Sequence, residues 1–148
     1  MNYGKFVAQR AKSIEISTIR YFFNMVKEVD GAVSLCIGEP DFVTPSHINR
    51  AAIQSLEDGH TFYTANAGHY KLRHEISDYL SRRYGLTYNP ESEIIVTIGA
   101  SQAIDVVIRT LVEPGDEVLI PQPSFVSYGP CTILAGGRPV YVPTYLED

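Results

Sequence analysis

Cysteine is scarce in this sequence, which contains only Cys36 and Cys131 in 148 residues. Two thiols cannot build the disulfide framework of a small secreted domain, and no CxxC pair of the zinc-binding kind is present. The four histidines also lack metal-ligand spacing: His69 and His74, for example, are five residues apart and do not share one helix face. We therefore predict buried thiols in a reducing cytoplasm, solvated histidines and no metal site.

Long apolar runs and an excess of basic charge are missing as well. No stretch approaches the roughly 20 apolar residues of a membrane-spanning helix, and residues 1–20 contain no apolar signal-peptide core, which argues against secretion. Twelve Lys and Arg against 17 Asp and Glu give a formal net charge of −5, which disfavours a general nucleic-acid binder. The 45% hydrophobic and 20% charged residues are the balance of a globular protein, and the length suits one compact domain.

Strand and helix patterns alternate along the second half of the chain. The nearly continuous apolar run at 93–98 predicts a strand covered on both faces, as in a parallel sheet. The spacing predicts a helix over 101–112, and the next apolar run predicts a buried strand over 118–120. A further helix is expected within 124–136, with its start kinked or delayed by Gly129-Pro130. A strand is predicted over 138–142. Upstream, the pattern predicts helices over 19–26, 45–58 and 70–84, the last with Leu72, Ile76 and Leu80 on one face, and a short strand over 33–37. This order is typical of an α/β protein with right-handed crossovers.

The turn from the predicted strand at 94–98 into the next helix is a candidate anion site. Gly99 allows close backbone approach, and the free amides of Ala100, Ser101 and Gln102 would lie at the positive end of the helix dipole. The alternative is ordinary helix capping, because small residues and Ser are common choices at a helix N-terminus. Arg109 lies two turns away, so a phosphate here would need a cation from another segment. Neither GxxxxGK[ST] nor GxGxxG is present, which disfavours a classical NTPase or dinucleotide fold.

Two aromatic residues are further candidates. Phe125 follows Pro121-Gln122-Pro123-Ser124, just past the carboxyl end of a parallel strand, where open α/β sheets bind their ligands. Its ring could stack on a flat heterocycle, or it could simply anchor its loop in the core. Tyr63 lies in a loop rich in Tyr, Thr and Asn, where a phenol could donate to a phosphate or could be plain surface.

Five motifs follow one another along the chain: Ile37-Gly38-Glu39-Pro40-Asp41-Phe42; Tyr63-Thr64 with Gly68 and Leu72-Arg73; Gly99-Ala100-Ser101-Gln102-Ala103-Ile104; Pro114-Gly115-Asp116-Glu117-Val118; and Pro123-Ser124-Phe125 with Tyr128. In this order they resemble the class I/II aminotransferases, fold-type I enzymes that use pyridoxal 5′-phosphate (PLP). The resemblance is closest to the subgroup with N-acetyl-diaminopimelate, aspartate and aromatic aminotransferases, and it covers the chain after residue 12.

The resemblance implies a role for each candidate. Ala100, Ser101 and Gln102 would hold the PLP phosphate, Phe125 would stack on the pyridine ring, and Gly38 would approach the substrate carboxylate through its backbone. Tyr63 would reach the phosphate of the neighbouring subunit, so that a homodimer shares its active sites. The substrates would be an α-amino acid and a 2-oxo acid.

The resemblance also implies what these residues lack. In the family, the Schiff-base lysine, the aspartate that pairs with the pyridine nitrogen and the carboxylate-binding arginine come later, and none of the lysines here lies in a Ser-x-Ser-Lys-like turn. We therefore expect an incomplete N-terminal part of the fold-type I large domain, a mostly parallel sheet with flanking helices, without a catalytic residue of its own and inactive alone. Residues 1–45 would form an arm and part of the small domain, and residues 46–148 the first part of the PLP-binding domain.

Alternatives remain open. One is a fold-type I lyase or acyltransferase, and another is a non-catalytic binding or regulatory module derived from the same fold. An unrelated domain that binds a phosphate ligand is the weaker third alternative.

Overall fold

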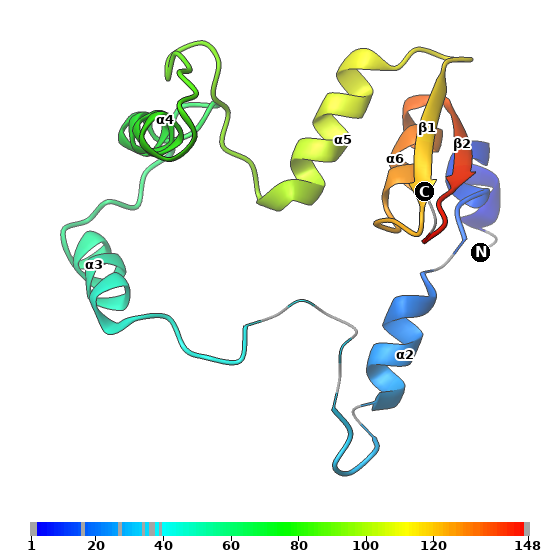
Figure 1. The fold of residues 1–148 in the computed structure, drawn as a ribbon, viewed down its shortest axis with the longest axis horizontal. Helices are drawn as coiled ribbons and strands as arrows, with labels where there is room; N and C mark the ends of the chain where they lie inside the picture. Colours follow the sequence, from blue (N-terminus) through cyan, green and yellow to red (C-terminus); the bar gives the residue numbers. More distant parts are fainter. Residues whose placement is uncertain are drawn as a thin grey trace. The chain divides into compact units, whose positions relative to one another are not determined.

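The structure, a computed structural model, describes residues 3–15, 17–26, 28–33, 35, 38 and 40–146. Its elements in chain order are η1 (Tyr3–Phe6), α1 (Gln9–Lys12), α2 (Thr18–Val26), α3 (Ser46–Glu57), α4 (Tyr70–Tyr84), α5 (Gly99–Leu111), β1 (Glu117–Gln122), α6 (Tyr128–Ala135) and β2 (Arg138–Pro143) (Figure 1). They belong to two units, residues 1–28 with 97–148 and residues 29–96, and each is described by itself. The expected boundary between residues 45 and 46 stays a prediction.

The first unit is built on a β1–α6–β2 segment. β1 and β2 pair in parallel, with Glu117 opposite Arg138 and Ile120 opposite Tyr141, and α6 packs on both strands and on α5 (Figure 1). The predicted α/β alternation is confirmed here. The predicted delay of the second helix is confirmed too, because α6 begins only at Tyr128.

One face of this two-stranded sheet is covered. Ile120 is 3% exposed, whereas its neighbour Leu119, which points to the opposite face, is 68% exposed. On the covered side the fully buried Thr132 donates a hydrogen bond from Oγ1 to the Tyr128 carbonyl at 2.9 Å. The expectation that the strand over 118–120 is buried is therefore right for one face only.

In the second unit, α4 carries the buried side chains. This helix ends at Gly85, which adopts the left-handed conformation (φ 69°) that favours glycine. Its buried residues are Arg73 and Ser77, not the predicted apolar row of Leu72, Ile76 and Leu80. The reason is that the segment packed on α4 offers backbone carbonyls: Ser77 Oγ donates to the Tyr88 carbonyl at 2.6 Å, and Arg73 Nη1 donates to the carbonyls of Pro90 and Glu91.

The predicted strand over residues 94–98 is wrong for this structure. The segment is irregular, and Ile95 and Ile98 are exposed. Its backbone bonds are the one from the Val96 N–H to the Ala67 carbonyl and a local one from the Gly99 N–H to the Thr97 carbonyl, both at 2.9 Å. A strand needs a neighbouring ladder of hydrogen bonds, and none of the described residues supplies one. The strand predicted over 33–37 falls largely outside the described residues.

Candidate functional site

The start of α5 brings together the residues of the predicted anion site. Gly99 opens the helix with φ 73°, a left-handed conformation that L side chains rarely adopt. Ala100, Ser101 and Gln102 follow in the first turn, and all three are exposed. The first amides of a helix have no acceptor within the helix, and no described residue outside α5 accepts from Ala100 or Ser101. The helix start is therefore open to an acceptor from outside.

Side chains on either side brace this turn. The Ile98 N–H donates to Gln102 Oε1 at 2.6 Å, and Thr97 Oγ1 donates to the Gly99 carbonyl at 3.0 Å. The side-chain oxygen of Gln102 thus accepts from the backbone at the start of its own helix, a capping interaction that the sequence pattern did not predict. Its backbone amide remains a candidate, together with those of Ala100 and Ser101.

No cation of α5 is available to this turn. Arg109 Nε donates to both carboxylate oxygens of Asp105 at 2.9 Å, one turn earlier on the same helix. The hydrogen bond from Asp105 raises the pKa of Arg109 above its usual range, and the charge of Asp105 adds to this. The first turn of α5 contains no acidic residue that would repel an anion.

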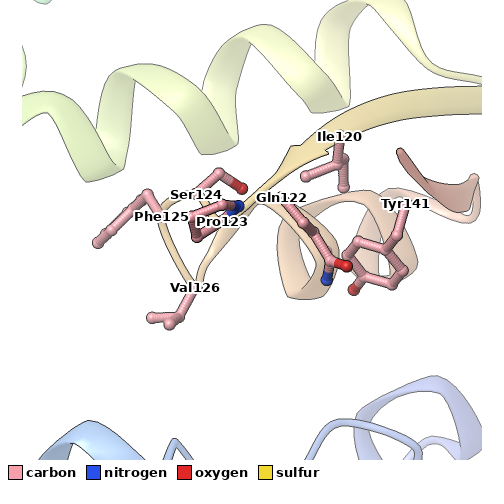
Figure 2. Close-up of a pocket in the computed structure, with 8 residues that line it drawn as sticks. Ile120, Gln122, Pro123, Ser124, Phe125, Val126 and Tyr141 are labelled. Atoms are coloured by element: carbon pink, nitrogen blue, oxygen red, sulfur yellow. The ribbon is translucent and has the colours of Figure 1, made fainter. Parts of the chain in front are cut away.

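Phe125 lines a pocket at the carboxyl ends of β1 and β2. The pocket has a volume of about 580 Å³. Figure 2 shows its lining residues, which are Ile120, Gln122, Pro123, Ser124, Phe125, Val126, Gly129 and Tyr141. The carboxyl edge of parallel strands is where open α/β sheets bind ligands. The sequence analysis predicted only Phe125 as a ligand-binding residue at this edge of the sheet. Tyr141 was missed, because its position at the pocket depends on the register of β2 against β1.

The ring of Phe125 keeps an open surface. It is 45% exposed and meets Tyr128 edge-on, with ring centroids 5.6 Å apart and an interplanar angle of 82°. An edge-on contact leaves a ring face free for stacking on another flat group. The alternative, a phenylalanine that anchors its loop in the core, is not favoured by this exposure.

The remaining site candidates lie in the second unit. Tyr63 is fully exposed and lines a pocket of about 340 Å³ with Phe62, His69 and other residues of its loop. Gly38 is exposed, and no heavy atom of the described chain lies within 4 Å of where a Cβ would be. The start of α5 and Phe125 thus belong to one unit, whereas Tyr63 and Gly38 belong to the other.

The predictions about cysteine, histidine and membrane spans have mixed outcomes. Among the described residues, no group of three or more His, Cys, Asp and Glu could hold a metal ion. No helix of the described ranges is long and apolar enough to cross a bilayer. Cys131 is a half-buried free thiol, whereas Cys36 lies outside the described residues. His74 is not solvated as predicted: its buried Nε2 has no hydrogen-bond partner among the residues that the structure describes, and its ring centroid lies 4.3 Å from that of Tyr70.

Comparison with known proteins agrees with this fold. The family described as aminotransferase class I and II matches residues 30–148. YugH of Bacillus subtilis, provisionally named an aminotransferase, is 52% identical over 139 residues, or 94% of this chain and 36% of that protein. Aromatic-amino-acid aminotransferase 2 of Thermococcus litoralis is 41% identical over 142 residues, or 96% of this chain and 36% of the relative.

A solved aminotransferase structure has a similar fold. The aspartate aminotransferase of Thermotoga maritima superposes with a TM-score of 0.86 at 35% identity, over 95% of this chain and 38% of the other. The fold and the helix start define an α/β protein with an open amide turn. The chain belongs to the class I and II aminotransferases, as the motifs predicted, and spans about a third of the length of the relatives it matches.

Proposed function

We propose that this chain supplies the phosphate-binding turn and the ring-stacking aromatic of a PLP-dependent aminotransferase. The observation that carries the proposal is the open start of α5, where Gly99 is left-handed and the exposed amides of Ala100 and Ser101 have no described partner outside the helix. Backbone amides at a helix start suit a phosphate. The half-exposed ring of Phe125, in the same unit, suits a flat heterocycle.

Each residue then has a definite task. Ala100, Ser101 and Gln102 would donate their backbone N–H groups to the phosphate, and Ser101 would add its hydroxyl. Gln102 would hold the turn in shape through the Ile98 N–H. Phe125 would lie against the pyridine ring and fix its tilt. When bound, PLP supplies the electron sink of the reaction, while the protein supplies orientation and electrostatics.

The substrate and dimer assignments rest on the family resemblance. We propose that the substrates are an α-amino acid and a 2-oxo acid, that the Gly38 backbone approaches the substrate carboxylate, and that Tyr63 donates to the phosphate of a neighbouring subunit in a homodimer. The full exposure of the Tyr63 ring supports this last role, because such a phenol is free to meet a second chain. A cytoplasmic location stays a prediction.

We expect no transamination from these 148 residues alone. None of the lysines, which are Lys5, Lys12, Lys27 and Lys71, lies in the sequence context of the family's catalytic lysine. The parts proposed here would bind and orient the cofactor, and proton transfer would need groups that they do not include.

A titration with PLP and with phosphate-free pyridoxal, followed by equilibrium dialysis, tests the proposal. We expect PLP to bind at least about tenfold more tightly than pyridoxal, because charged groups form the stronger hydrogen bonds. Phe125→Leu should weaken PLP binding about two- to tenfold through lost stacking.

The matched control is Phe22→Leu. Phe22 is 52% exposed and also lies in an edge-on aromatic pair, with Tyr21 at 5.8 Å, but it belongs to α2. Equal affinity for PLP and pyridoxal would contradict the phosphate-binding turn. Equal effects of the Phe125 and Phe22 substitutions would contradict the stacking role.

A further inference from the structure

Tyr141 is a β2 residue that the proposed function does not use. Its register partner on β1 is Ile120, so both side chains point to the face that α6 covers. Its ring lines the pocket that contains Phe125 and also a second pocket of about 570 Å³, in which Val126 and Ser127 take part. Tyr141 therefore borders both pockets, and Figure 2 shows it in the first of them.

The hydroxyl of Tyr141 fills the space where residue 129 would carry a side chain. Gly129 is buried in the first turn of α6, and a Cβ built there would collide with the Tyr141 hydroxyl oxygen. The φ of Gly129 is not in the left-handed region, so its backbone would tolerate alanine, the better helix former. With Tyr141 in its present place, space rather than conformation therefore favours glycine at this position.

This contact reaches Phe125 through the neighbouring residue Tyr128. The Tyr128 N–H donates to the Phe125 carbonyl at 3.3 Å, and the two rings meet edge-on at 5.6 Å. A shift of the α6 start would therefore move Tyr128, and with it the ring and backbone of Phe125.

We infer that Tyr141 is a positioning residue that holds the start of α6 through Gly129, and thereby sets the place of the Phe125 ring. The inference rests on the proposed function, in which that ring stacks on the cofactor. Tyr141 itself touches neither cofactor nor substrate in this role, and a strand-borne phenol is a firmer support than a loop residue would be.

The contact between Gly129 and Tyr141 can be tested by adding a methyl group at residue 129 and removing the hydroxyl oxygen at residue 141. Gly129→Ala adds the colliding methyl group. In the Gly129→Ala/Tyr141→Phe double variant the oxygen is gone and the nearest atom to the methyl is Cζ at 3.2 Å, which needs a shift of only a few tenths of an ångström. Tyr84→Phe, at an exposed residue of α4, is the control for loss of a phenol hydroxyl.

Two readouts are needed for the folded, full-length protein. The first is the PLP dissociation constant, which should rise about tenfold in Gly129→Ala and return to within about threefold of the wild-type value in the double variant. The second is the near-ultraviolet circular dichroism of the cofactor-free protein. Because these 148 residues contain no tryptophan, the signal of this part of the protein comes from tyrosine and phenylalanine. It should change in Gly129→Ala and return in the double variant.

The outcomes separate the two proposals. If the wild-type protein does not bind PLP, the proposed function fails, and the spectra of the cofactor-free variants still decide whether Tyr141 sets the aromatic pair. If the wild type binds PLP but Gly129→Ala changes neither readout, the inference fails. It fails as well if Tyr141→Phe does not restore Gly129→Ala, or if Gly129→Ala merely raises the melting temperature, as expected for a better helix former in free space.

Discussion

Replacing Ser101 by aspartate should move stability and cofactor affinity in opposite directions. Ser101 is exposed in the first turn of α5, which contains no acidic residue. A carboxylate there meets the positive end of the helix dipole and should stabilise the cofactor-free protein by about 0.3–1 kcal/mol. For a protein of this size or somewhat larger, that is a rise of about 1–4 °C in melting temperature.

The same carboxylate should weaken PLP binding. It accepts hydrogen bonds and donates none, so the proposed donor to the phosphate is lost and a like charge takes its place. Losing one hydrogen bond to a charged group costs about 1.5–3 kcal/mol, which is about a 10- to 150-fold rise in Kd. Thermal melts of the cofactor-free protein and equilibrium dialysis with PLP measure the two effects.

Ser101→Asn is the matched control. It is neutral and similar in size to aspartate, and it keeps both an N-terminal capping acceptor and a hydrogen-bond donor. We expect its Kd for PLP to lie within about threefold of the wild-type value, because asparagine still offers a hydrogen-bond donor to the phosphate. An aspartate variant that melts higher and binds PLP as tightly as the asparagine variant would refute the phosphate-binding turn and leave plain helix capping as the explanation.

Three further predictions concern the described contacts. The Arg73 side chain is only 7% exposed, and Arg73→Met leaves the carbonyls of the loop after α4 without their donor. The free energy of unfolding, measured in urea titrations, should fall by about 2–3 kcal/mol. A loss below about 0.5 kcal/mol would contradict this account. Ile120→Ala should cost about 2–4 kcal/mol in the same assay, whereas Leu119→Ala should cost far less. Burial raises the pKa of the Cys131 thiol, so less thiolate is present at pH 8; in a Cys36→Ser background, alkylation by iodoacetamide should be slower than in urea and should accelerate as the pH rises.

Elements whose partners are close in the sequence could be predicted from the sequence. β1, α6 and β2 follow one another within 27 residues (117–143) and pair with each other, so local patterns determined both their existence and their order. The delayed start of α6 followed from Gly129-Pro130, and the end of α4 from Gly85. These signals act within one or two turns of chain and need no distant contact.

What depends on a distant partner could not be predicted. The run over 94–98 has the composition of a buried strand, but a strand exists only where another one pairs with it. The buried face of α4 was misjudged for a similar reason, since Arg73 and Ser77 are inside because of carbonyls 11 to 18 residues away. Tyr141 was missed because only the pairing of β2 with β1 and the packing of α6 on β2 bring it to Gly129.

The candidate site shows the same division. The motifs singled out the start of α5 and Phe125 because both lie in short segments that end or begin an element, and the structure places the two in one unit. The bond between Gln102 and the Ile98 N–H, and the pairing of Arg109 with Asp105, are side-chain choices that the motifs do not determine.

Among the described elements only α6 packs on the β1–β2 sheet, so its other face is uncovered in this part of the chain, which has a practical consequence for handling the protein. Leu119 and Val142 lie on the side away from α6, and both are exposed. A bare apolar sheet face next to unpaired strand backbone is a template for aggregation. Dilute samples of the 148-residue chain, kept in arginine or a mild detergent, should be monodisperse in light scattering. Concentrated samples without an additive should form larger particles.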